Sequence, residues 1–238
     1  MTPATPAVRA QEREGRLTAG GICVIGLSPG HAAAIAQIAA FLPACFARWR
    51  YLQTEREARA EVLASLAAER ISRIAIAEDG TVLGWCGGIP EYGGRVWELH
   101  PMAVRPGHQR RGVGRALLGD FEAQVRERGG STVILATDDV DGASSAYGVD
   151  LYPEIWRYIR DLVPYADHPF RFYWKCGYVV SGLVPDANGP GKPGILMAKR
   201  VAVEGGEGTA PPWGGRAGVP GSPHASRAVP PAAPFAAR

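Results

Sequence analysis

A short loop rich in glycine and arginine, Gln109–Gly114, lies between a segment with the character of a strand and one with the character of a helix. The preceding residues, Val96–Val104, are mostly apolar, and Gly112–Arg128 repeats apolar residues at the spacing of an amphipathic helix. The first turn of a helix presents N–H groups and the positive end of the macrodipole, and glycines let a phosphate approach the backbone. The sequence therefore predicts an anion-binding strand–loop–helix unit. Three arginines add positive charge to it: Arg110, Arg111 and Arg115.

This loop differs from two other phosphate-binding motifs. It has no Lys-Ser/Thr pair, which a P-loop requires, and no G-x-G-x-x-G pattern, which a dinucleotide-binding fold requires. A single Gly-x-Gly before a helix is also compatible with a loop that only caps the helix. The loop residues by themselves therefore indicate an anion site without identifying its ligand.

The remaining apolar patterns alternate between the periods of strands and helices. Further strands are expected at Ile22–Leu27, Ser72–Ala77, Val82–Ile89, Val133–Ala136, Tyr178–Val184 and Gly194–Lys199. Further helices are expected at Ala32–Phe46, Thr54–Arg70 and Pro169–Cys176. Thr54 and Glu57 have the spacing of a capping box, and the wholly apolar Val133–Ala136 suits a buried parallel strand. This order predicts an α/β fold in which helices flank a central mixed sheet.

Length and composition limit the number of domains. The chain has 238 residues, of which 46% are hydrophobic, and this is enough to bury a full core. From residue 204 to residue 238 the composition shifts to glycine, proline and alanine, which cannot offset the entropy cost of ordering. We therefore predict one folded domain over residues 17–203, between disordered segments at residues 1–16 and 204–238.

Charge, cysteine spacing and hydropathy each argue against a class of partner or site. A net charge of +3 gives no reason to expect nucleic acid or an anionic membrane as a partner. The four cysteines are too scattered for a zinc or redox site, so no metal is expected and the free thiols suit a cytoplasmic protein. The N-terminal residues lack the apolar core of a signal peptide. Ala32–Phe46 is shorter than the roughly 20 residues that cross a bilayer, and we interpret it as a buried helix.

Several motifs together resemble those of a known enzyme family. Gln109–Gly114 is similar to the Q/R-x-x-G-x-G/A motif that binds pyrophosphate in the GNAT acetyltransferases. Within this superfamily, the chain resembles the aminoglycoside 6'-N-acetyltransferases from about Ile71 to Lys199. The similarity is carried by Trp97–Pro101, Thr137–Asp139, His168–Pro169, Phe172–Tyr173, Pro185–Gly189 and Lys192–Pro193. The resemblance implies the GNAT fold with splayed central strands, acetyl-CoA as cosubstrate and a homodimer.

The resemblance also implies catalytic roles for two side chains, and strand alternation adds a third candidate. Glu98 lies on an otherwise apolar strand and matches the family's proposed base, so it is expected to act as base or to anchor the substrate amine. Burial would raise the pKa of this carboxylate into a useful range for a base. His100 follows two residues later, so strand alternation puts it on the same face, where it could relay protons through water. Tyr173 matches a tyrosine that serves as general acid for the coenzyme sulfur. Structural alternatives stay open: a glutamate that faces solvent or pairs with an arginine, a structural histidine and a core aromatic.

The implied donor site consists of the end of one strand and the loop that follows it. The strand is expected to splay at Met102–Val104 and to offer backbone N–H groups to the thioester and pantetheine. Methionine stands at position 102, where the family usually has leucine. The residues expected to contact the coenzyme are Met102, Ala103, Val104, Gln109, Arg110, Arg111, Gly112, Val113, Gly114 and Arg115.

An acidic segment between residues 138 and 167 offers candidate contacts for a cationic acceptor. Solvated loop carboxylates are the structural alternative. The resemblance points to Asp141 as an acceptor contact, together with Asp138 and Asp139. Tyr92 matches an aromatic side chain that packs on sugar rings. Trp49 or Tyr51 is expected to supply a second aromatic surface.

The resemblance implies transfer of an acetyl group from acetyl-CoA to the 6'-amine of aminoglycoside antibiotics. Such a modification gives resistance because it removes a positive charge that the drug needs to bind RNA. Two alternatives stay open. One is acetylation of protein lysines or other cationic amines, and the other is a catalytically silent module that binds acyl-CoA or the drug.

Overall fold

The computed structural model describes residues 16–17, 22–165 and 168–202. The segments predicted to be disordered, 1–16 and 204–238, lie outside these residues except for Arg16. The domain limits at residues 17 and 203 therefore stay a prediction.

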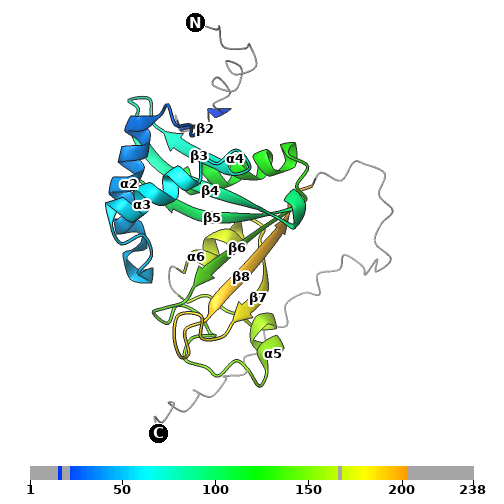
Figure 1. The fold of residues 1–238 in the computed structure, drawn as a ribbon. Helices are drawn as coiled ribbons and strands as arrows, with labels where there is room; N and C mark the ends of the chain where they lie inside the picture. Colours follow the sequence, from blue (N-terminus) through cyan, green and yellow to red (C-terminus); the bar gives the residue numbers. More distant parts are fainter. Residues whose placement is uncertain (1–15, 18–21, 166–167, 203–238) are drawn as a thin grey trace, which may run out of the picture. The chain divides into compact units, whose positions relative to one another are not determined.

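Eight of the described segments form a mixed β-sheet in the order β1-β2-β3-β4-β5-β6-β8-β7 (Figure 1). These strands are β1 (Arg16–Leu17), β2 (Cys23–Gly26), β3 (Ile71–Ile76), β4 (Val82–Glu91), β5 (Val96–Val104), β6 (Thr132–Asp138), β7 (Val179–Val184) and β8 (Gly194–Arg200). β5 and β6 run parallel, and the other neighbouring pairs are antiparallel. The predicted α/β fold with a mixed sheet is confirmed.

Helices pack on both faces of this sheet, around two separate apolar clusters. The helices are α2 (Ala32–Phe46), α3 (Glu55–Ala64), α4 (Val113–Glu127), α5 (Ile155–Arg160) and α6 (Pro169–Lys175), with 3-10 turns η1 (Ala47–Trp49) and η2 (Tyr92–Gly94). Leu117 and Phe121 of α4 belong to one cluster. Ile38 of α2 and Val62 of α3 belong to the other, together with Trp85 of β4. The central strands are therefore held between helices on either side.

β5 and β6 separate along their length, which is the expected splay of the central strands (Figure 1). Their parallel pairing joins only Val96, Trp97 and Glu98 of β5 to the start of β6. Beyond Glu98, β5 continues to pair with β4, whereas β6 continues to pair with β8. A wedge consequently opens between the second halves of the two strands.

A β-bulge in β5 lies at the start of this wedge. Leu99 pairs with Gly88 and Met102 pairs with Cys86, so β5 carries one more residue than β4 over this interval. An extra residue exchanges the two faces of a strand. Leu99 accordingly packs in the cluster of α4, whereas Ala103 packs in the cluster of α2 and α3. Gly87 is required opposite the bulge, because a Cβ atom there would lie 2.6 Å from the His100 carbonyl oxygen.

Most predicted elements are confirmed to within a few residues, but the helix predicted over Thr54–Arg70 is too long. Its capping box is present, since Thr54 Oγ1 accepts from the Glu57 amide at 3.2 Å and the Glu57 carboxylate accepts from the Thr54 amide at 3.2 Å. The helix ends at Ala64, where the Ser65 hydroxyl instead donates to the Val62 carbonyl oxygen at 2.6 Å. Serine side chains compete with helical backbone bonds in this way.

Three other features differ from the prediction. β1 and α5 were not expected, because one is only two residues long and the other lies within a segment dominated by acidic and turn-forming residues. β6 is parallel to β5 as expected, but it is not buried on both faces, since Ala136 is exposed. β6 borders the wedge, and the face of β6 that carries Ala136 is not covered by a helix at that position.

The apolar helix α2 packs on the sheet through one face. Ile35, Ile38 and Leu42 are buried in the cluster that it shares with α3 and β4, and its exposed positions are mostly alanines. By length and composition alone, Ala32–Trp49 could cross a membrane, and 28% of this window is buried. The predicted buried helix is therefore confirmed for one face of α2.

Candidate active site

The loop before α4 has the open backbone that an anion site needs. Arg110 and Gly112 adopt left-handed conformations, with φ of 60° and 89°, and α4 begins at Val113. A Cβ atom at position 112 would meet no other atom within 4 Å, so a ligand can approach the backbone there. The first turn of α4, all of which is described, contains no acidic side chain. This loop fits a pyrophosphate group at a helix N-terminus.

The end of β5 lies against the start of α4. A Cβ atom at Gly114 would lie 3.6 Å from Val104 Cγ2, and the Gln109 side-chain amide donates to the Val104 carbonyl oxygen at 3.3 Å. The predicted coenzyme contacts of the strand, Met102–Val104, are therefore brought beside those of the loop. Both groups lie at the open end of the wedge between β5 and β6.

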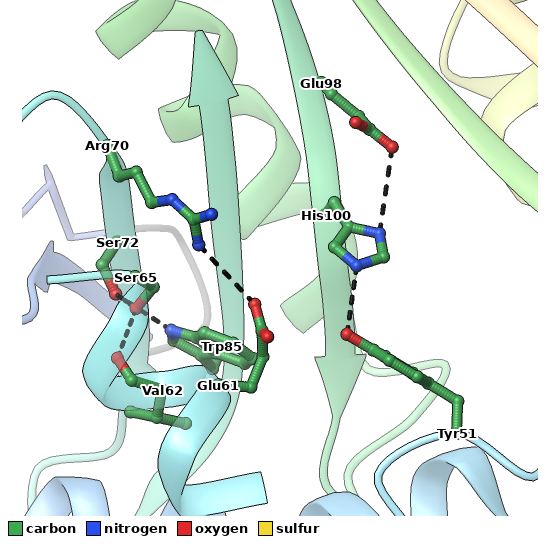
Figure 2. Close-up of polar contacts among 9 residues, drawn as sticks. All are labelled: Tyr51, Glu61, Val62, Ser65, Arg70, Ser72, Trp85, Glu98 and His100. Atoms are coloured by element: carbon green, nitrogen blue, oxygen red, sulfur yellow. Dashed lines mark hydrogen bonds and ion pairs between the residues drawn. The ribbon is translucent and has the colours of Figure 1, made fainter. Parts of the chain in front are cut away.

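Three polar side chains form a row on the α2 and α3 side of β5 (Figure 2). Tyr51 Oη lies 3.0 Å from His100 Nε2, and His100 Nδ1 lies 3.9 Å from Glu98 Oε1. Glu98 and His100 thus share a face, as strand alternation predicts. The Glu98 side chain is 32% exposed and that of His100 is 41% exposed. The burial that we expected for Glu98 is therefore only partial.

The electrostatics of the row favour one arrangement of its protons. A carboxylate beside Nδ1 favours the tautomer in which Nδ1 carries the hydrogen, and Nε2 then accepts from the Tyr51 hydroxyl. The pKa of Tyr51 is raised to about 12, mainly by burial and then by the nearby carboxylates of Glu61 and Glu98, against the opposing effect of Arg70. The phenol therefore keeps its proton at neutral pH.

A second group of polar contacts joins α3 to the sheet (Figure 2). The hydroxyls of Ser65 and Ser72 lie 2.8 Å apart, and the Trp85 indole N–H donates to Ser72 Oγ at 3.0 Å. An ion pair of 3.8 Å joins Arg70 to Glu61. These contacts fix α3 on β3 and β4, and with it the loop that carries Tyr51.

Tyr173 lies on the opposite side of β5 from the row. Its ring packs against the cluster of α4 and forms edge contacts with Phe172, at 5.1 Å, and Tyr178, at 5.8 Å. Burial raises the pKa of Tyr173 above its ordinary value, and the nearby thiols of Cys86 and Cys176 add to the rise. The neutral phenol is the form that can donate a proton.

The loop after β6 is joined to the turn after α2. The Trp49 indole N–H donates to the Asp138 carbonyl oxygen at 3.1 Å, and Arg48 forms an ion pair of 3.2 Å with Asp141. His168 Nε2 lies 3.2 Å from the same Asp138 oxygen, while its Nδ1 accepts from the Phe170 amide. This pattern requires a neutral imidazole, in agreement with a pKa that burial lowers. Trp49 and Asp141 are therefore brought together, as the predicted acceptor site requires.

Comparisons with known proteins agree with this geometry. The Acetyltransferase (GNAT) family profile matches residues 35–148. A solved aminoglycoside 6'-N-acetyltransferase in complex with coenzyme A is 30% identical, with a TM-score of 0.71 over 76% of this chain and 98% of the other. The aminoglycoside 6'-N-acetyltransferase from Enterococcus faecium gives 30% identity and a TM-score of 0.70 over the same shares. Comparison with curated proteins gave no match.

The high coverage of these relatives decides the family. The chain belongs to the GNAT acetyltransferase family. The predicted resemblance to aminoglycoside 6'-N-acetyltransferases is also confirmed. The GNAT fold, and the coenzyme A bound in one relative, support acetyl-CoA binding by this acetyltransferase. Among residues 16–17, 22–165 and 168–202, no group of three or more His, Cys, Asp or Glu side chains could hold a metal ion.

Two predicted acceptor contacts of the acetyltransferase lie in settings that the sequence did not indicate. Asp139 is fully buried, and its Oδ1 accepts from the amides of Gly142 and Ala143, so it folds the loop from within. Tyr92 is 78% exposed in the turn between β4 and β5. Among the described residues, no hydrogen bond or ring contact joins Tyr92 to the row of Tyr51, His100 and Glu98.

Sequence reasoning missed two partners within this site. Tyr51 was considered only as an aromatic surface, although its hydroxyl bonds to His100. Arg48 was not considered, although it pairs with Asp141 and its guanidinium lies 5.2 Å from the centre of the Trp49 ring. The only local signal for either was their place in the run Arg48-Trp49-Arg50-Tyr51, where aromatic and basic residues alternate.

Proposed function

We propose that this acetyltransferase moves an acetyl group from acetyl-CoA to the 6'-amine of aminoglycoside antibiotics. The observation that carries the proposal is the row of Glu98, His100 and Tyr51 beside the wedge between β5 and β6. It combines a carboxylate and an imidazole at the point where the sheet opens. The aminoglycoside specificity rests on the relatives at 30% identity.

Acetyl-CoA is the donor in this proposal, and the backbone provides most of its site. The N–H groups of Val113, Gly114 and Arg115 precede the first helical bond of α4, in which the Ala116 amide donates to the Gly112 carbonyl oxygen. They suit the pyrophosphate, with charge added by the arginines of the loop. The pantetheine and thioester would then follow β5 at Met102–Val104, where β6 has diverged.

The reaction on the acceptor side needs a neutral amine. An ammonium group has no lone pair, so it must lose a proton before attack, and Glu98 is the proposed base. His100 lies close enough to Glu98 to share that proton through water. Tyr51 is the proposed positioning residue, because its hydrogen bond holds the imidazole in the orientation that faces Glu98. The amine nitrogen then bonds to the acetyl carbon and loses its second proton to solvent water, from which Tyr173 later recovers the proton that it gives to the coenzyme sulfur.

The reaction on the donor side needs a proton for the departing sulfur. The C–S bond breaks as the C–N bond forms, and the coenzyme thiolate takes the proton of the Tyr173 phenol. Base and acid lie on opposite sides of β5, since Glu98 faces Tyr51 while Tyr173 packs in the cluster of α4. This separation suits a direct transfer in which the amine attacks the thioester from one side and the departing sulfur is protonated from the other.

The acceptor is proposed to lie between the turn after α2 and the loop after β6. Asp141 and Trp49 offer a carboxylate and an aromatic ring to its ammonium groups. Asp138 and the exposed Tyr92 are proposed to make outer contacts. Asp139 is proposed to act indirectly, by shaping the loop that presents Asp141.

We also propose that the protein works in the cytoplasm as a homodimer. β7 is the last strand of the described sheet, and Val179 and Val184 on it are exposed. A second copy that covers this edge would bury them. Light scattering would give twice the monomer mass, whereas a monomer mass across micromolar concentrations would refute the dimer.

The decisive experiment measures coenzyme thiol release from acetyl-CoA with three acceptors. Kanamycin, which carries a 6'-amine, should give turnover and a product acetylated at that nitrogen. An analogue with a 6'-hydroxyl should be inert, and its reaction at an equal rate would contradict the proposed regiochemistry. Release with lysine peptides but not with kanamycin would refute the aminoglycoside substrate. Binding of acetyl-CoA without release for any amine would indicate a silent module.

A further inference from the structure

Arg48 occupies a place that a cationic ligand would otherwise take. Its Nη2 lies 3.2 Å from Asp141 Oδ2, and its Cζ lies 5.2 Å from the centre of the Trp49 ring. A carboxylate and an indole face are the two groups that proteins commonly use to bind an organic cation. In this structure, both groups contact a guanidinium of the same chain.

The Trp49 ring is held more firmly than the ion pair between Arg48 and Asp141. The Trp49 indole N–H donates to the Asp138 carbonyl oxygen at 3.1 Å, and His168 Nε2 lies 3.2 Å from the same oxygen. The Arg48 and Asp141 side chains are 49% and 43% exposed, and ion pairs of such exposure contribute little to stability. Departure of Arg48 would therefore cost little, and it would leave the Trp49 ring held by its bond to Asp138.

We propose that Arg48 is an internal competitor for an ammonium group of the acceptor. The acceptor's cation displaces the guanidinium from Asp141 and Trp49, and the charge of Arg48 weakens the binding of every cationic acceptor. The group concerned is a second ammonium of a polycationic amine, because the reacting amine must lie at Glu98. This inference rests on the proposed function and names a residue that sets acceptor affinity within it.

The first test compares two arginine-to-alanine substitutions on the same side of the sheet. Arg48→Ala should lower the KM for kanamycin about threefold to tenfold, because it removes a like charge from the ammonium site. The KM for acetyl-CoA and kcat should change less than about twofold, since neither depends on that charge. Arg59→Ala, on the exposed face of α3, removes the same charge elsewhere and should change the kanamycin KM by less than about twofold.

A double-mutant cycle then tests whether Arg48 acts through Asp141. Asp141→Asn should raise the kanamycin KM by a larger factor in the Arg48→Ala background than in the wild type, because Arg48 already neutralises Asp141 in the wild type. Equal factors in both backgrounds would overturn the proposed link. A rise in KM from Arg48→Ala would also overturn the inference, since it would make Arg48 a support for the acceptor site.

Calorimetric binding of kanamycin separates this inference from the proposed function. If the wild type binds kanamycin without turnover, the proposed reaction fails, but Arg48→Ala should still tighten binding by the same threefold to tenfold factor. Unchanged or weaker binding by the variant overturns the inference whether or not turnover occurs. The gain should shrink as salt rises from about 0.05 M to 0.5 M, because screening weakens the competition.

Discussion

The two sides of the wedge are built in different ways. The proposed coenzyme-binding part of the donor side uses one continuous stretch, Met102–Arg115, whose backbone bends at Arg110 and Gly112 and then enters α4, and Tyr173 adds the proposed acid. The proposed acceptor side uses side chains from separate segments: the turn after α2, the middle of β5 and the loop after β6. The first depends on local backbone conformation, whereas the second depends on tertiary packing.

This difference determines how each side should respond to mutation. Backbone N–H groups cannot be removed by changing a side chain, so the donor side is sensitive to backbone conformation at glycine. The acceptor side should be sensitive to single atoms, because each function depends on one carboxylate, imidazole or hydroxyl. Four substitutions test this contrast.

Glu98→Gln should have the largest effect. The amide keeps the size of the side chain but cannot take the acceptor's proton, and loss of a general base lowers kcat by a factor of about 10²–10⁴. Steady-state kinetics with kanamycin would measure it. Glu69→Gln, at an exposed position after α3, is the matched control and should retain the wild-type kcat. A Glu98→Gln variant with kcat within a factor of about three would assign the carboxylate to binding alone.

Tyr173→Phe should have the second-largest effect, on the donor side. Loss of a general acid lowers kcat by a factor near the lower end of the same range, about 10². The pKa of Tyr173 is raised, so the phenol stays protonated as pH rises to its ordinary value of about 10. The ratio of wild-type to variant kcat should therefore be constant from pH 7 to about 10.

The matched control for this variant is Tyr178→Phe. Its ring lies 5.8 Å from that of Tyr173, so it loses a hydroxyl in the same cluster. It should retain kcat even if its stability falls. Equal losses of kcat in the two variants would show that Tyr173 contributes through packing and not as the acid.

The same contrast explains how much the sequence predicted. Val96–Val104 and Gly112–Arg128 were predicted almost to the residue, because apolar periodicity and glycine conformations act locally. The pairing of Tyr51 with His100 joins residues 49 positions apart, and that of Arg48 with Asp141 depends on how the loop after β6 folds around Asp139. No local pattern encodes such contacts. Glu98 and Tyr173 were proposed mainly through resemblance, since a single glutamate or tyrosine carries no spacing signal.

Gly112→Val tests the donor side directly and should have an intermediate effect. A β-branched residue in the left-handed conformation is strained by about 1–2 kcal/mol, and the loop would shift to relieve that strain. The KM for acetyl-CoA should rise about tenfold, because the N–H groups before α4 would no longer point to one phosphate position. The KM for kanamycin should change little.

Gly80→Val is the matched control for the donor loop. Gly80 has φ of 81° and open space around its Cβ position, but it lies in the hairpin turn between β3 and β4. Both valine variants should lose similar stability in thermal unfolding, and only Gly112→Val should lose acetyl-CoA affinity. Equal acetyl-CoA KM values in the two variants would contradict the proposal that the loop Gln109–Gly114 binds the coenzyme.

Tyr51→Phe should have the smallest effect and is the finest test of the acceptor side. The substitution keeps the ring contact with Phe46, at 5.4 Å, and removes only the hydroxyl that bonds to His100. One hydrogen bond is worth about 0.5–1.5 kcal/mol, which corresponds to a loss of kcat of about twofold to tenfold with little change in either KM. Tyr152→Phe, at an exposed position, should cause no loss.

The pH dependence of this variant separates a positioning role from general destabilisation. The Tyr51 pKa of about 12 lies above its ordinary value, so the hydroxyl should donate to His100 at all pH values below that point and fail only above it. The ratio of wild-type to Tyr51→Phe kcat should therefore stay level from pH 7 to about 10.5. A ratio that falls to one with a midpoint near 10 would mean that Tyr51 ionises as an exposed phenol does. The Tyr51 hydroxyl would then not be the group that positions His100.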